Sequence, residues 1–83
     1  MAEHGEAQTE NVGAFLREAR ETTGRSVADV EASLRIRAKF LRSIEDGRYE
    51  DLPGQTYAVG FIRSYADFLG LETVALLEQF KKE

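Results

Sequence analysis

The stretch LPGQTYAVGFIRSYADFLGL, residues 52–71, contains the only proline of the chain and two of its three tyrosines. At the 3.6-residue period of an α-helix it carries two neighbouring apolar stripes. The first stripe is Ala58, Ile62, Tyr65, Ala66 and Leu69, and the second is Tyr57, Phe61 and Phe68. A surface helix needs one stripe to dock on its own domain, so we expect the second to be covered by other residues or offered to a partner.

Both ends of this stretch carry helix boundary signals. Pro53 cannot continue a preceding helix but fits the first turn of a following one. Gly70 is a natural left-handed stop. The sequence therefore predicts a helix over about residues 54–68, and a loop over residues 48–55 whose large apolar side chains fold back onto the core.

Hydrophobic periodicity predicts four more helices, over about residues 11–23, 26–34, 38–46 and 72–82. Thr9 or Asn11 caps the first, and Ser26 with Asp29 forms an acidic variant of the capping box at the second. The expected core residues are Val12, Phe15, Leu16, Ala19, Val27, Val30, Leu34, Phe40, Leu41, Ile44, Val74, Leu77 and Phe80. The charged residues of the first helix are expected on a solvated face: Arg17, Glu18, Arg20 and Glu21.

The second and third of these helices are short and are joined by residues 35–37, whose Ile36 would plug the core between them. Two short helices joined by such a turn form a helix-turn-helix motif. No segment shows strand periodicity. The predicted fold class is all-α, a five-helix bundle over residues 10–83 that resembles the λ-repressor-like helix-turn-helix class, after a disordered tail at residues 1–9.

The composition of the chain argues against several classes of function. Eighty-three residues make one domain with a small core. The chain has no cysteine, no phosphate-cradling glycine loop and one histidine, His4, in the predicted tail. We therefore expect no catalytic residues, metal site, cofactor or small-molecule substrate. No apolar run is long enough to cross a membrane.

The stretch quoted above also resembles a signature of the cytoplasmic amino-terminal domain of RodZ proteins: LPG followed by YxxGFIRSYAxFLGL. The resemblance implies a bacterial cell-shape adaptor that binds the actin-like filament protein MreB. It would act at the cytoplasmic side of the inner membrane, through a transmembrane segment outside this chain. It also implies that Tyr57 and Phe61 contact MreB. Arg63 would rim that interface or form a surface ion pair with Asp67, four residues on.

The alternative function is DNA binding by the third helix. Residues 25–48 carry a net charge of +2, whereas residues 1–24 and 49–83 carry −3 each. The basic residues at the start of the third helix, which could contact bases or phosphates, are Arg35, Arg37, Lys39 and Arg42. The acidic Glu45 and Asp46 on the same helix weigh against this role.

Two positions depart from the usual helix-turn-helix pattern. Arg35 stands where the class commonly has glycine, and arginine is usual there in RodZ-like sequences. Glu31 stands where the class commonly has a small residue. The fold can accept Glu31 in one of two ways. Either its side chain extends along the helix so that the carboxylate reaches solvent, or Ala32 makes the close helix contact in its place.

Overall fold

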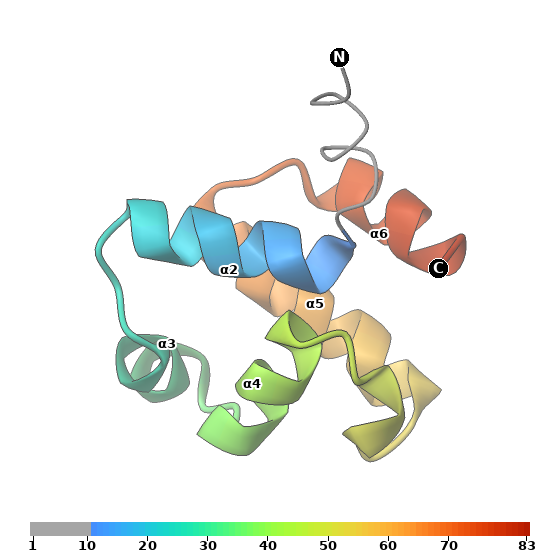
Figure 1. Cartoon of the computed structure of the whole chain (residues 1–83), viewed down its shortest axis with the longest axis horizontal. Helices are drawn as coiled ribbons and strands as arrows, with labels where there is room; N and C mark the ends of the chain where they lie inside the picture. The colour runs from blue at the N-terminus through green and yellow to red at the C-terminus, as the bar shows by residue number, and fades with distance from the viewer. Residues whose placement is uncertain (1–10) are drawn as a thin grey trace.

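The computed structural model describes residues 11–83, and Figure 1 labels their helices. The elements are α2 (Val12–Thr22), α3 (Val27–Leu34), α4 (Ala38–Glu45), the 3-10 helix η1 (Tyr49–Asp51), α5 (Gln55–Leu69) and α6 (Thr73–Lys81). Five α-helices with no strand in this range confirm the predicted all-α class. The predicted tail, with Thr9 and His4, lies outside the described residues.

Local signals in the sequence explain where the helices begin and end. The Asn11 side chain accepts a hydrogen bond of 2.7 Å from the Ala14 backbone N–H and so caps α2. Ser26 and Asp29 form the predicted reciprocal capping box at α3. The glycines that follow α2, α4 and α5 all have the positive φ of a left-handed stop: Gly24, Gly47 and Gly70.

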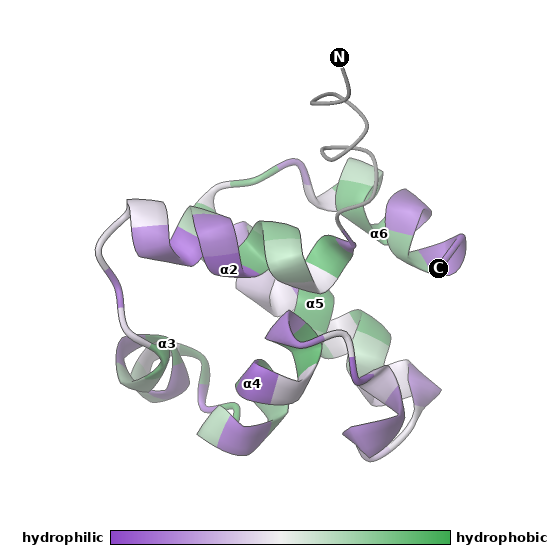
Figure 2. Ribbon diagram, viewed as in Figure 1, coloured by the Kyte–Doolittle hydropathy of each residue, from purple (hydrophilic) through white to green (hydrophobic). Residues whose placement is uncertain are grey.

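Helix α5 is the central element of the bundle. It contacts α2, α3, α6 and η1, and Figure 1 shows it passing behind α2 and α4. Four residues of its first stripe are buried, namely Ala58, Ile62, Tyr65 and Ala66, and Leu69 is half-buried. Figure 2 shows the hydrophobic segments of α2, α5 and α6 where these helices meet. The quoted stretch therefore does organise the core.

Two residues predicted for the core lie at the surface instead. The exposed fraction of Phe15 is 41% and that of Val74 is 73%. Helix α6 is turned so that Leu76 and Phe80, four residues apart, face the core, while Leu77 is half-buried. Periodicity found the helix and placed Phe80 correctly, but it assigned Val74 to the core and missed Leu76, because apolar residues occur on more than one side of the helix.

The carboxy-terminal residue of the chain contacts the start of α2 and the loop before α5. The Glu83 carboxylate accepts hydrogen bonds from the Val12 backbone N–H at 2.8 Å and from the Tyr49 hydroxyl at 3.0 Å. The Tyr49 ring packs edge-on against Phe80, with ring centroids 4.9 Å apart. Leu52 in the same loop is buried. The predicted folding back of the loop is thus confirmed, although its 3-10 turn was not predicted.

Candidate interaction surface

The helix-turn-helix unit consists of α3, residues 35–37 and α4. Arg35 adopts the left-handed conformation, with φ of 60°, and is the one non-glycine residue with positive φ in the described range. This explains why glycine is common at the position, since a side chain there costs conformational energy. Ile36 is buried as predicted. The turn therefore fixes the orientation of α4 relative to α3.

A cationic patch covers the turn and the outer side of α4. We define it as Arg35, Arg37, Lys39 and Arg42, all of which are exposed. Among residues 11–83, none of the four forms an ion pair with a carboxylate. Lys39 instead places its ammonium group 5.2 Å from the centre of the Phe40 ring. The patch therefore presents its positive charge to solvent.

The acidic residues of α4 do not cancel that charge. Glu45 is 5% exposed and is hydrogen-bonded by both Nε and Nη2 of Arg20, at 2.8 and 3.0 Å. Asp46 is paired with Arg17 at 2.5 Å. The sequence argument that these two carboxylates oppose anion binding is therefore weakened, because each is already paired with an arginine of α2.

The same contacts hold three helices together beneath the surface. Glu45 on α4 is held by Arg20 on α2 and accepts a hydrogen bond from the Tyr65 hydroxyl on α5. Burial opposes ionisation of the Glu45 carboxyl, but hydrogen bonds from Arg20 and Tyr65 outweigh it and lower its pKa. The expected solvated position of Arg20 was wrong, because its side chain is only 11% exposed. Neither periodicity nor spacing could reveal this pairing between distant segments.

Both accommodations expected for Glu31 were wrong. Its side chain is half-buried, and Oε2 accepts a hydrogen bond of 3.1 Å from the backbone N–H of Ala38, the first residue of α4. Ala32 is exposed and makes no close helix contact of the kind expected. The physical reason is that Arg37, the N-cap of α4, supplies no side-chain cap. A carboxylate from the preceding helix satisfies the free N–H instead.

A row of three aromatic rings adjoins the cationic patch. We define the aromatic row as Tyr57, Phe61 and Phe40. The Tyr57 and Phe61 ring centroids are 5.8 Å apart, and those of Phe61 and Phe40 are 5.9 Å apart. Tyr57 is 56% exposed, while Phe61 and Phe40 are half-buried. The row joins α5 to α4, so Phe40 connects the aromatic surface to the patch through Lys39.

The third member of the second stripe does not belong to this row. Phe68 is half-buried, and the guanidinium of Arg25 lies 4.5 Å from the centre of its ring. The structure thus divides the stripe that the sequence treated as one. At its amino-terminal end Tyr57 is exposed and Phe61 is half-buried against Phe40, while at its carboxy-terminal end Phe68 is half-buried against Arg25.

Arg63 is exposed but does not share a face with the aromatic pair. At about 100° per residue, it points roughly 160° away from Phe61 around the axis of α5. The predicted ion pair with Asp67 does not form among the described residues, because Asp67 accepts a hydrogen bond of 2.5 Å from the Thr73 hydroxyl instead. A contact from Arg63 would therefore need a partner that reaches around α5.

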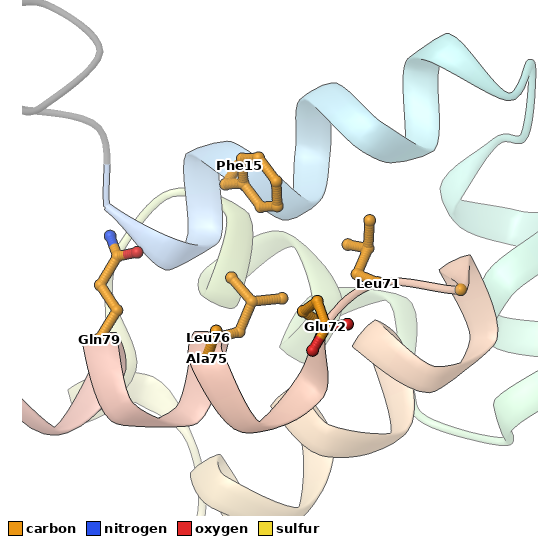
Figure 3. Close-up of a pocket in the computed structure, with 7 residues that line it drawn as sticks. Phe15, Leu71, Glu72, Ala75, Leu76 and Gln79 are labelled. Atoms are coloured by element: carbon orange, nitrogen blue, oxygen red, sulfur yellow. The ribbon is translucent and has the colours of Figure 1, made fainter.

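An apolar groove lies between α2 and α6, with Phe15 facing Leu71, Ala75 and Leu76 (Figure 3). Its volume is about 460 Å³. A second hollow of about 380 Å³ shares Phe15 and Leu71 with the first. Among the described residues that line the larger groove, Glu72 is the single carboxylate, so no second one pairs with it there for general acid–base chemistry.

Comparison with known proteins supports the class of domain that this geometry defines. The helix-turn-helix domain family matches residues 15–76, and the chain belongs to that family. A curated relative is the uncharacterized membrane protein YmfM of Bacillus subtilis (strain 168). It is 36% identical over 58 residues, which are 70% of this chain and 20% of the relative. The chain thus spans about a fifth of that relative's length. No solved structure gives a significant match.

Within residues 11–83, no helix combines the length and the apolar character needed to cross a bilayer.

Proposed function

We propose that this domain is a non-enzymatic, RodZ-like adaptor that binds an MreB-like actin homologue through the aromatic row. In this proposal a membrane segment elsewhere in a longer protein holds the domain at the cytoplasmic face of the bacterial inner membrane. The signature in residues 52–71 supports this assignment. The similarity of the chain to part of a protein described as a membrane protein is also compatible with it.

The observation that carries the proposal is the position of Tyr57. A tyrosine ring that is 56% exposed contributes little to the core of its own domain. Phe61 lies between Tyr57 and Phe40 and limits the freedom of the exposed ring. Rigid aromatic side chains of this kind anchor protein interfaces, because they bury much area at a small cost in conformational entropy.

Co-sedimentation with polymerised MreB tests the proposal directly. We expect Tyr57→Ala and Phe61→Ala each to weaken binding by more than about fivefold, equivalent to about 1 kcal/mol, because each truncates an interface anchor. Tyr57→Ala should leave the free energy of unfolding within about 0.5 kcal/mol, since Tyr57 is at the surface. Circular dichroism melts of all variants check this.

Arg63→Ala is the matched control, because Arg63 lies on α5 but on another side of the helix. We expect the affinity of this variant for MreB to differ from that of wild type by less than twofold. A loss for Arg63→Ala equal to that for Tyr57→Ala would show that the binding surface is not the aromatic row. Equal sedimentation of the wild-type domain and both aromatic variants would contradict the adaptor proposal.

The second candidate function is DNA binding, as in other helix-turn-helix domains. The exposed, unpaired cationic patch favours it, because basic side chains on the turn and on α4 are placed to contact phosphates. Affinity for duplex DNA would then fall steeply between about 50 and 200 mM salt. Arg37→Ala and Lys39→Ala would weaken it, and Arg63→Ala would not.

A further inference from the structure

Glu31 places a negative charge at the amino-terminal end of α4. Its Oε2 accepts the Ala38 N–H at 3.1 Å, so the carboxylate touches the peptide unit between Arg37 and Ala38. The end of the helix that carries the positive pole of the dipole is therefore already occupied by an anion that belongs to the chain. This contact satisfies a backbone donor that Arg37 leaves uncapped.

The location of this carboxylate matters because the surrounding surface is cationic. The residues on either side of Ala38 in the chain, Arg37 and Lys39, both belong to the cationic patch. Among the described residues, the Glu31 carboxylate forms no ion pair with any of the four patch side chains. Its charge is thus held by a backbone hydrogen bond while the basic side chains stay free.

In a helix-turn-helix protein on DNA, the start of the second helix faces the nucleic acid. Helix amino termini and basic side chains are both used to bind phosphates. A duplex that docked here would bring its phosphates close to the fixed carboxylate of Glu31, and like charges repel. A protein partner can place single carboxylates against individual basic side chains, and Arg42 lies one helical turn beyond Ala38.

We propose that Glu31 is a specificity-determining residue of the cationic patch. It disfavours the polyphosphate backbone of a nucleic acid and leaves the patch to isolated carboxylates on a protein partner. The inference rests on the proposed adaptor function, in which the patch lies beside the aromatic row. It also gives a role to a glutamate at a position where the helix-turn-helix class commonly has a small residue.

Binding of a fluorescein-labelled 20-base-pair duplex, measured by anisotropy at 50 mM salt, tests the inference. Glu31→Gln removes the charge but keeps an oxygen that can accept the Ala38 N–H, so we expect the contact with α4 to be kept. We expect this variant to bind the duplex roughly three- to tenfold more tightly than wild type. Glu31→Ala, a second variant that also removes the charge, should also bind the duplex more tightly than wild type.

Glu50→Gln is the matched control, because Glu50 is exposed on η1 and its loss changes the net charge equally. We expect its affinity for the duplex to differ from that of wild type by less than twofold. Equal binding curves for Glu31→Gln and Glu50→Gln, or no duplex binding by any variant, would overturn the inference. Sedimentation of Glu31→Gln with MreB should stay within twofold of wild type. Because the duplex experiment does not use MreB, failure of the adaptor proposal is distinguishable from failure of this one.

Discussion

At the scale of single residues, Tyr65 illustrates how one side chain links the core to the charges beneath the surface. Its ring is 0% exposed, as the first stripe predicted, and its hydroxyl donates to Glu45. Burial and the neighbouring carboxylate both disfavour the phenolate, so the pKa of Tyr65 is raised. Tyr65 is therefore neutral at physiological pH and available as a donor to Glu45.

Tyr65→Phe tests this link. The substitution keeps the ring and removes one donor to a buried carboxylate, so we expect the free energy of unfolding to fall by about 2 kcal/mol. Urea unfolding at pH 7 measures it. Tyr57→Phe removes a hydroxyl from an exposed ring and should change stability by less than about 0.5 kcal/mol. Equal effects of the two substitutions would mean that the hydroxyl of Tyr65 adds nothing beyond its ring.

At the scale of elements, α2 and α4 approach each other closely at Gly13. A Cβ atom on Gly13 would lie 1.8 Å from the Ile44 carbonyl oxygen, a distance that only movement of the backbone could relieve. The Gly13 N–H also donates to the Tyr49 hydroxyl at 3.2 Å. Gly60 in α5 differs, because a Cβ atom there would meet nothing within 4 Å.

Alanine at these two glycines should therefore have opposite effects. We expect Gly13→Ala to lower the free energy of unfolding by at least about 2 kcal/mol, since α2 and α4 must separate. Gly60→Ala should raise it by roughly 0.5–1 kcal/mol, because alanine is the better helix former. Thermal melts followed by circular dichroism compare them. A Gly13→Ala variant as stable as Gly60→Ala would refute the close approach of α2 to α4.

At the scale of the whole molecule, the distribution of charge matters more than the net charge of −4. Glu45 and Asp46 are paired with arginines of α2, and within residues 11–83 no carboxylate forms an ion pair with the four basic residues of the patch. The aromatic row borders this patch. One surface thus combines features that the sequence assigned to two alternative functions.

The buried carboxylate also predicts how stability depends on pH. The pKa of Glu45 is lower in the folded protein than its ordinary value of 4.5. Its contribution is therefore complete above that value and is lost as the pH falls through the folded pKa. We expect urea midpoints to be nearly constant from pH 7 to about pH 5.5 and to fall below about pH 4.5.

Glu45→Gln separates this carboxylate from the others. The variant should lose roughly 3 kcal/mol at pH 7, because it leaves the Arg20 guanidinium without its anionic partner, and its midpoints should depend less on pH. Glu50→Gln, at an exposed position, should keep the wild-type profile. A Glu45→Gln profile parallel to that of wild type would show that other carboxylates cause the acid transition.

The sequence by itself determined the five helices, their order, the capping box of α3, and the buried stripe of α5. These features follow from interactions between residues a few positions apart, which periodicity and capping motifs record directly. The expected role of Tyr57 and Phe61 at an interface stays a prediction. That part rested on a resemblance to a family and not on periodicity alone.

Only the tertiary structure decided which residues the helices bring together. The aromatic row needs Phe40 and Phe61 from two helices, the buried cluster needs Arg20, Glu45 and Tyr65 from three, and the cap of α4 comes from Glu31 on α3. Tertiary packing also left Phe15 and Val74 at the surface. Contacts between distant segments depend on how helices cross, and a pattern read along one helix contains no information about that angle.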